Sequence, residues 1–371
     1  MQTFDIIIVG AGINGCSLAY SLNKRGQSVL VLEQDDIASG GSGAAGAFIN
    51  PKISKSGPLK ELIEKAYLYA LPFYRENFNN HTTLAPLLHI AKYEDENDKV
   101  EYFKTHTSLK TGDIPAELSS SLTPHANSFS SVYIKDNAIV EAKHVCEAML
   151  EGIQREKVKV EVPKYEDGFW CINLYRAKKL VLCTGGYDEI VKEPYIKLRR
   201  IFGQRCEIES STLMRATVHH EVSVSATKKN GRIAVGASHH LDKEMMPTKE
   251  EGEAELIRLA QKSVKLDDLR LISSFTGMRS GSNDYLPMLG SVVKAQESIH
   301  KHPETLKGNK ELELEYYPEL YMINGVGGYG FVLAPYLSKL MSEHLIDGQE
   351  LPEYLAPKRF FYRWAKKEAS L

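Results

Sequence analysis

The chain has 371 residues, of which 43% are hydrophobic and 25% are charged, and its formal net charge is −2. This composition is typical of a globular enzyme and excludes a disordered, collagen-like or coiled-coil chain. It also excludes a global basic field that would attract nucleic acid, so such contact needs a local patch.

Membrane, export and metal signals are absent from the sequence. No apolar run reaches the roughly 18 residues of a membrane helix, and the N-terminus lacks the basic region of a signal peptide. The five cysteines are scattered and form no CxxC pair. We therefore expect a cytoplasmic protein with reduced thiols, no membrane contact and no metal.

The first 33 residues predict a βαβ unit. A continuous apolar run over 4–9 is typical of a strand buried on both faces. GAGING follows at 10–15, the next ten residues have helical spacing, and a second buried strand over 28–32 ends at Glu33. This order of elements is the context that a dinucleotide-binding fingerprint requires.

Each fingerprint residue has a physical role. Gly10 allows the tight turn, Gly12 lets the backbone approach a pyrophosphate, and Gly15 lets the helix pack on the sheet. The positive end of the helix then faces the phosphates. Glu33 is expected to accept hydrogen bonds from the adenosine ribose.

Two later glycine-rich segments favour FAD over NAD. SGGSGAAG at 39–46 follows the unit closely and is expected to approach the bound dinucleotide a second time. GVGGYG at 325–330 follows a buried strand and opens a helix. Such a helix N-terminus can stabilise negative charge on a reduced flavin.

The other elements are expected in this order: a helix over 59–78, a helix over 141–156, a hairpin over 158–174, a buried strand over 179–183, strands over 202–208, 218–225 and 233–238, a helix over 249–263, an exposed excursion over 294–313, a strand over 320–323 and a helix over 331–346. The pattern predicts an α/β fold with a Rossmann-like FAD-binding domain and a discontinuous α+β substrate domain of mainly antiparallel sheet. The expected FAD-binding domain comprises 1–80, 137–198 and 276–350, the substrate domain 81–136 and 199–275, and a basic aromatic tail 351–371.

Several motifs together resemble a known family. The βαβ unit, SGGSGAAG, VLCTGG at 181–186, GMRSGSNDYLPMLG at 277–290 and INGVGGYG at 323–330 resemble, in that order, the D-amino-acid oxidase/glycine oxidase family of FAD-dependent amine oxidoreductases. The resemblance covers nearly the whole chain. It implies oxidation of a glycine-type C–N bond, with hydride passing to the flavin and water hydrolysing the resulting imine.

One group within that family is more similar still. The segments at 46–77, 233–240 and 355–367 resemble the oxidoreductase half of bifunctional tRNA-modifying enzymes. The resemblance implies removal of the carboxymethyl group from 5-carboxymethylaminomethyluridine in tRNA, with release of glyoxylate. Because the given sequence begins at the fingerprint, we expect no methyltransferase half in it, and a separate methyltransferase stays open as a partner.

The fingerprint, the glycine-rich segments and the resemblance together name the residues expected to bind FAD. FAD is expected to be non-covalent, because no cysteine lies beyond Cys206 to tether it. The expected FAD-binding residues are Gly10, Gly12, Ile13, Asn14, Gly15, Glu33, Gln34, Ser39, Ser42, Gly43, Gly46, Thr184, Gly185, Gly325, Gly327, Gly328, Tyr329 and Gly330.

Arg279 is the main candidate for substrate binding and catalysis. Glycine oxidase has an arginine at the matching position that binds the substrate carboxylate, although here Ser280 replaces the proline that follows it. A carboxylate entering a mostly apolar pocket must be paired, and arginine can pair it bidentately. The alternative is that Arg279 anchors its own loop to Asp284.

Two further residues have open roles. Tyr329 is expected to line the pocket near the flavin, with a core tyrosine as the alternative. His240 is expected to face the substrate, although its neighbour His239 could do so instead, and a solvated histidine at a strand end is the alternative. The sequence identifies no necessary general base.

The tail KRFFYRWAKK at 358–367 has five basic and four aromatic side chains. Such a segment can hold phosphates and stacked bases, or form a terminal helix whose aromatic rings pack on the protein. It favours tRNA as the substrate over free glycine, sarcosine or a D-amino acid. A non-catalytic flavin-binding protein is the third alternative.

Overall fold

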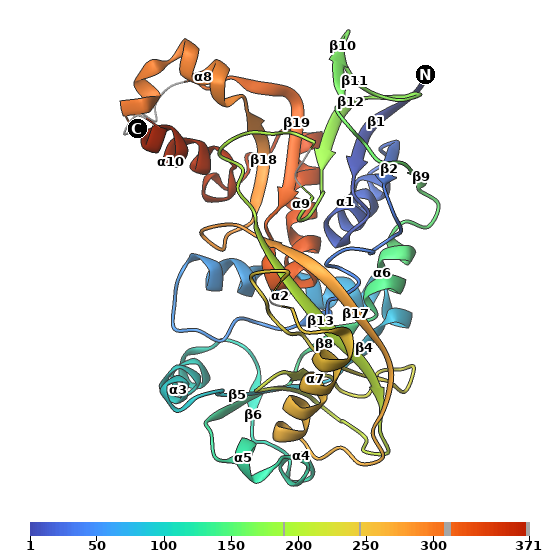
Figure 1. Cartoon of the computed structure of the whole chain (residues 1–371), viewed down its shortest axis with the longest axis vertical. Helices are drawn as coiled ribbons and strands as arrows, with labels where there is room; N and C mark the ends of the chain where they lie inside the picture. Colours follow the sequence, from blue (N-terminus) through green and yellow to red (C-terminus); the bar gives the residue numbers. More distant parts are fainter. Residues whose placement is uncertain (188–189, 245, 308–312, 369–371) are drawn as a thin grey trace.

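The computed structural model describes residues 1–187, 190–244, 246–307 and 313–368. Its first sheet has a parallel core in the order β9–β2–β1–β12–β19, with antiparallel β18 beside β19 and the hairpin β10–β11 continuing from β12. This sheet occupies the upper half of Figure 1. Its strands are β1 (Gln2–Val9), β2 (Val29–Glu33), β9 (Gln154–Lys157), β10 (Lys164–Glu166), β11 (Phe169–Ile172), β12 (Tyr175–Leu182), β18 (Met288–Val293) and β19 (Tyr316–Asn324).

Both faces at the centre of this sheet are covered, which is why β1 and β2 read as continuous apolar runs. Ile6 and Ile8 of β1 belong to one buried cluster, and Ile7 and Val9 to another on the opposite face. On the first face α9 packs against α1 and α2, and α6 packs against α1. The helices are α1 (Ile13–Lys24), α2 (Pro58–Asn77), α6 (Ala142–Met149), α9 (Gly330–Asp347) and, on the second face, α8 (Ala295–Lys301) and α10 (Lys358–Glu368).

The second large sheet has the order β17–β13–β16–β15–β14–β5–β7–β6 and lies in the lower half of Figure 1. Its long strands β13 and β17 pair along their whole length and reach up to the first sheet. β17 crosses the domain boundary expected at 275/276. The strands are β5 (Leu87–Ile90), β6 (Thr111–Gly112), β7 (Ser131–Ile134), β13 (Arg199–Glu209), β14 (Thr217–His219), β15 (Ser223–Val224), β16 (Ile233–Gly236) and β17 (Arg270–Gly281).

Shorter elements complete the described chain. A small sheet has the order β3–β8–β4, and α7 packs on β13 and β16. These elements are β3 (Phe48–Ile49), β4 (Thr82–Leu84), β8 (Ala138–Val140), α3 (Asn97–His106), α4 (Ala116–Ser121), α5 (Pro124–Asn127) and α7 (Lys249–Ser263), with 3-10 turns at Asn79–His81, Glu94–Glu96, Pro303–Lys307, Gly327–Tyr329 and Glu353–Leu355.

Three expected elements differ from the structure. The helix expected over 141–156 ends at Met149, because the chain reverses at Gly152 (φ +74°) and enters β9. The strand expected over 218–225 is the hairpin β14–β15. The excursion expected over 294–313 forms α8 and a 3-10 turn, with Ser298 and Thr305 buried, and residues 308–312 lie outside the described residues.

Candidate FAD and substrate site

The carboxyl ends of β1, β2, β12 and β19 lie at one edge of the parallel sheet, where ligands bind in such folds. A cavity of about 1000 Å³ opens at this edge. The turns after these strands line one part of it, and residues of the second sheet, including Arg279, His89 and His219, line another. One cavity therefore contains the expected dinucleotide site and a second part, which Arg279, His89 and His219 line and which is called the second chamber below.

Most of the residues expected to bind FAD line this cavity; Gly15, Gly43 and Gly325 do not. A Cβ atom at Gly15 would lie 1.9 Å from the Gly10 carbonyl oxygen, so Gly15 allows α1 to pack against the turn. Those that line the cavity are Gly10, Gly12, Ile13, Asn14, Glu33, Gln34, Ser39, Ser42, Gly46, Thr184, Gly185, Gly327, Gly328, Tyr329 and Gly330.

The polar groups at the dinucleotide turn fit the FAD that the fingerprint implies. Asn14 is buried, its Oδ1 has no partner in the described part of the chain, and it lines the cavity. At Gly327 and Gly328 no atom beyond the adjoining residues of the chain lies within 4 Å of the position that a Cβ atom would take. The cavity thus offers an unpaired polar atom and open backbone where a dinucleotide would lie.

Glu33 is fixed at the end of β2. Its carboxylate accepts hydrogen bonds from the backbone N–H groups of Ala11 (2.7 Å) and Asp35 (3.0 Å). The bond to Ala11 joins the end of β2 to the turn after β1. Together the two bonds hold the Glu33 carboxylate at the cavity wall, where the fingerprint predicts the ribose.

The SGGSGAAG loop packs tightly against β17. A Cβ atom at Gly41 would lie 2.6 Å from the Met278 carbonyl oxygen, and Arg205 donates a hydrogen bond to the Gly43 carbonyl (3.1 Å). Glycine is therefore needed at Gly41 because the loop approaches protein backbone, and Gly41 also lines the cavity together with Ser39, Ser42 and Gly46.

Arg279 projects from β17 into the cavity. Its guanidinium donates one hydrogen bond, to the Ser238 carbonyl (2.9 Å), and forms no ion pair with a carboxylate of the described residues. Burial lowers the pKa of Arg279, but arginine stays charged. A desolvated cation without a counter-ion is costly, so the site favours an anionic ligand.

The alternative role for Arg279, anchoring its loop to Asp284, is wrong. The Asp284 carboxylate instead binds the guanidinium of Arg359 (3.0 and 3.1 Å) and that of Arg363 (3.2 Å), both from α10. Asp284 also accepts bonds from Ser282 and from the Leu286 N–H, as a turn residue does.

Tyr329 lines the cavity, and the Lys52 ammonium lies 5.6 Å from the centre of its ring. Burial raises the pKa of Tyr329 and lowers that of Lys52. His240 is not among the lining residues, whereas His239 is. Since neighbouring residues of an extended chain point to opposite sides, His239 is the histidine of this segment that faces the cavity.

Sequence reasoning missed three contributors to the site. Asn324 ends β19, is fully buried, and its amide donates to the Gly185 carbonyl (2.9 Å). His89 and His219 line the second chamber from neighbouring strands. No local motif marks these residues, because their partners are distant in sequence.

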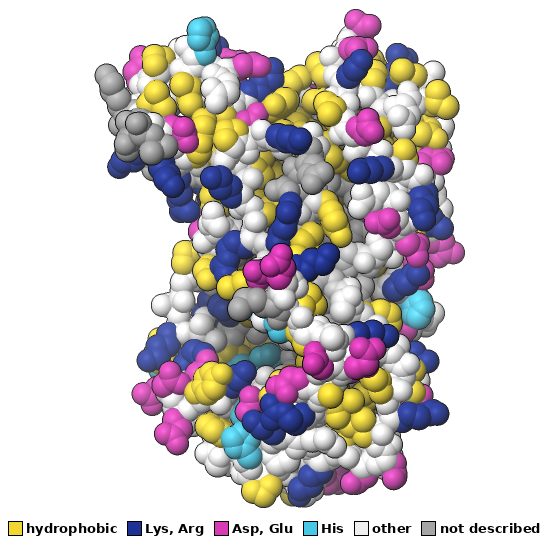
Figure 2. All heavy atoms as spheres, in the orientation of Figure 1, with side chains coloured by type: hydrophobic (Ala, Val, Ile, Leu, Met, Phe, Trp, Pro, Cys, Tyr) yellow, Lys and Arg dark blue, Asp and Glu magenta, His cyan; other side chains and the backbone are white. Residues whose placement is uncertain are grey.

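The C-terminal segment forms the terminal helix α10. Phe360 and Phe361 are buried in the core, so these two rings do not stack on bases. Arg359 is held by Asp284, and Arg363 and Lys367 are exposed. Figure 2 shows positive and negative side chains interspersed over one face of the protein.

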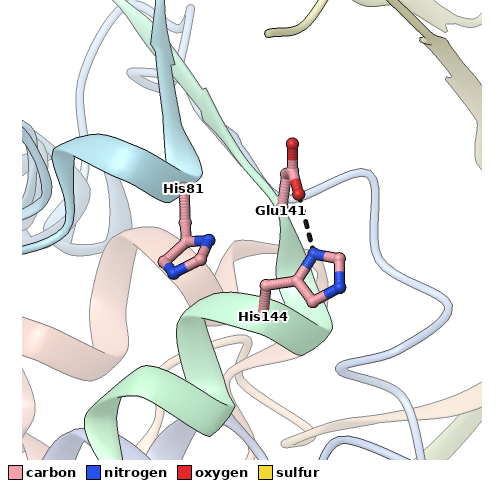
Figure 3. Close-up of side chains that lie close together, drawn as sticks. All are labelled: His81, Glu141 and His144. Carbon is pink, nitrogen blue, oxygen red and sulfur yellow. Dashed lines mark hydrogen bonds and ion pairs between the residues drawn. The ribbon is translucent and has the colours of Figure 1, made fainter. Parts of the chain in front are cut away.

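Outside the cavity, His81, Glu141 and His144 gather beside α6 (Figure 3). One donor atom of each lies within 4.8 Å of the other two, and these residue types can bind Zn²⁺ or Ni²⁺. The Glu141 carboxylate, however, is already bonded to His144 Nδ1 (2.7 Å), and the His144 side chain is 59% exposed. The structure therefore shows a hydrogen-bonded pair of Glu141 and His144, with His81 as a second histidine beside it.

A family model described as "FAD dependent oxidoreductase" matches residues 5–344. The chain belongs to this family. It is therefore an FAD-dependent oxidoreductase, as the motifs predicted, and FAD is its cofactor. Within the described ranges, no helix is long and apolar enough to cross a membrane.

Curated relatives include the tRNA 5-methylaminomethyl-2-thiouridine biosynthesis bifunctional protein MnmC of Legionella pneumophila strain Corby, which is 25% identical over 95% of this chain and 57% of its own length. MnmC of Leptospira interrogans serovar copenhageni is 26% identical over 99% of this chain and 62% of its own length. The chain thus spans about three fifths of these relatives.

Solved structures share the fold. Glycine oxidase of Geobacillus kaustophilus has a TM-score of 0.76 at 18% identity, covering 97% of this chain and 99% of its own. Glycine oxidase of Bacillus cereus has a TM-score of 0.74 at 19% identity, covering 94% and 96%. The expected α/β fold with an FAD-binding Rossmann-like part is confirmed.

Proposed function

We propose that this chain removes the carboxymethyl group from 5-carboxymethylaminomethyluridine in tRNA and releases glyoxylate. The observation that carries the proposal is Arg279, a cation without a carboxylate partner among the described residues, in the cavity that also holds the dinucleotide turn. The similarity to MnmC supports tRNA as the source of the amine. We also propose that the chain is divided, as expected, into an FAD-binding domain and a substrate domain.

The residues of the cavity bind and orient the substrate. Arg279 pairs the glycine-type carboxylate, and its bond to Ser238 fixes the direction of the guanidinium. Tyr329, which lines the same cavity, would pack against the bound substrate and limit the access of water. Bound FAD supplies a two-electron acceptor. In balance, the secondary amine and one water give the primary amine, glyoxylate and two reducing equivalents.

A second candidate is the oxidation of free glycine or sarcosine. The same Arg279 would bind their carboxylate, and glycine oxidases share the fold. The two functions differ in what occupies the second chamber, which free glycine has no group to reach.

The proposal includes the setting of the reaction. The protein binds FAD non-covalently. It acts on tRNA in the cytoplasm and does not contact a membrane. The exposed face of α10, with Arg363 and Lys367, is a candidate contact for the tRNA backbone. A separate methyltransferase is the candidate partner that would methylate the primary amine.

The test compares glyoxylate release by the FAD-loaded protein from three substrates. These are tRNA bearing 5-carboxymethylaminomethyluridine, free glycine and free sarcosine. The proposal expects release from the tRNA at least 100-fold faster, at equal concentration, than from either amino acid. Turnover of the amino acids alone would overturn it in favour of the second candidate.

A further inference from the structure

The second chamber of the cavity contains a pair of stacked histidines. His89 of β5 and His219 of β14 are directly paired in parallel register, so both side chains project from the same face of the sheet. Their ring centres lie 5.1 Å apart with 22° between the planes. Both residues line the cavity that Arg279 and Tyr329 also line.

Part of the hydrogen-bonding capacity of this pair is unused. His219 Nδ1 shares a hydrogen bond with Ser223 Oγ (2.5 Å), which leaves Nε2 available. The His89 ring makes no hydrogen bond to a residue that the structure describes, and stacking on His219 is its ring contact. The chamber therefore presents ring nitrogens that a ligand can satisfy.

Burial favours the neutral form of both rings. Burial lowers the pKa of His219 to about 4 and that of His89 well below its usual value. A neutral imidazole has one donor and one acceptor nitrogen. Such a pair suits an uncharged, planar group with alternating acceptors and donors rather than a second carboxylate.

Apolar side chains line the same cavity. Ile53, Leu87 and Phe48 are among its lining residues. An apolar wall with a few fixed polar atoms is typical of a site for a flat, partly polar ring. A pyrimidine ring has such a shape, and its C=O, N–H and C=O edge offers acceptor, donor and acceptor in one row.

We propose that His89 and His219 form the subsite that receives the pyrimidine ring of the substrate while Arg279 holds its carboxylate. This inference rests on the proposed function and deepens it, because it names the feature that separates a nucleoside-linked amine from free glycine. The stacked pair is the specificity determinant of the second chamber.

The experiment measures binding of uridine, an unreactive probe, to the FAD-loaded full chain by isothermal titration calorimetry. Uridine is expected to bind saturably, and 3-methyluridine, which lacks the ring N–H, at least tenfold more weakly. His89→Phe and His219→Phe keep flat rings but remove the nitrogens, and each should raise the Kd for uridine about tenfold or more. His106→Phe, an exposed histidine that stacks on Tyr102, is the matched control and should leave the Kd unchanged.

FAD content and melting temperature show that each variant is folded, and the 3-methyluridine comparison needs no variant. The proposal is overturned if the wild type does not bind uridine, if 3-methyluridine binds equally well, or if folded variants keep the wild-type Kd. Absence of glyoxylate release from tRNA would reject the proposed function through a separate measurement that does not involve uridine binding.

Discussion

Ser280 donates a hydrogen bond to the side-chain oxygen of Asn324, across 2.8 Å in the core. The same oxygen accepts from the Gly325 N–H (2.8 Å), and the Asn324 amide nitrogen donates to the Gly185 carbonyl (2.9 Å). One buried side chain thus joins the turn after β12, the turn after β19 and the residue next to Arg279. It also gives Ser280 a role at the position where the family pattern has proline.

Replacing Asn324 with alanine should therefore loosen the dinucleotide and substrate parts of the site together. The change leaves the Ser280 hydroxyl, the Gly325 N–H and the Gly185 carbonyl without their partner, at a cost of roughly 2–4 kcal/mol. We expect a clearly lower melting temperature and reduced FAD content. Ser280→Ala, which removes one bond, should cost only about 1 kcal/mol. Equal effects of the two substitutions would contradict the network.

Gly15→Ala tests the packing of α1 on the dinucleotide turn. The added Cβ atom would lie 1.9 Å from the Gly10 carbonyl oxygen, so the turn must shift. We expect the purified variant to lose most of its bound FAD, measured by its visible absorbance. Gly26→Ala is the control, because nothing lies within 4 Å of its Cβ position and the strain of its positive φ affects only stability. FAD content equal to wild type in Gly15→Ala would reject this role.

Arg359→Ala should destabilise the protein through Asp284. Their side chains are only 12% and 15% exposed, and removing one partner leaves a desolvated charge, at a cost of about 3 kcal/mol. Chemical denaturation should show this loss, while Arg363→Ala, at a 62% exposed side chain, should cost less than about 1 kcal/mol. A wild-type unfolding midpoint for Arg359→Ala would show that α10 does not hold this turn.

Stability should fall as the pH drops from about 6.5 to 4 because of His219. Above pH 6.5 the histidine is neutral in both folded and unfolded chains and contributes nothing. Below it the unfolded chain binds a proton that the folded chain excludes until its lowered pKa of about 4 is reached. Groups that act on this pKa after burial are Glu96, which raises it, and His220 and Lys92, which lower it.

The measurement is the melting temperature between pH 7 and pH 5. His219→Phe should reduce its decline, whereas the exposed His106→Phe should decline more nearly as wild type does. If the melting temperature of folded His219→Phe falls with pH as steeply as that of the wild type, burial of this imidazole does not cause the loss of stability in acid.

Local signals predicted several elements well, and partners distant in sequence account for the rest. The helix Lys249–Ser263 has the expected bounds because Thr248 and Glu251 form a capping box that marks its start. The βαβ unit could be predicted because its first strand, its glycines and Glu33 all lie within the first 33 residues. The helix expected over 141–156 was too long because its last residues form β9. The four residues of β9 are charged or polar and show no strand pattern, although they pair with buried β2.

The candidate site shows the same limit. The glycine turns and Arg279 could be named from motifs. The partner of Asp284 could not, because it is Arg359, which lies 75 residues later in the chain. The stacked pair joins His89 to His219, on strands whose neighbourhood no local pattern predicts. His239 rather than His240 lines the cavity, because a one-residue shift along an extended segment changes which side chain faces it.

The most direct test of the account is anaerobic reduction of the bound flavin by substrate. The wild type, mixed without oxygen with tRNA bearing 5-carboxymethylaminomethyluridine, should lose its visible flavin absorbance in proportion to the amine added. Arg279→Gln should keep its FAD but require at least 100-fold more substrate, since the carboxylate loses its charged partner. If the flavin of the wild type stays oxidised with this tRNA, or if Arg279→Gln is reduced as readily as wild type, the central claim is contradicted.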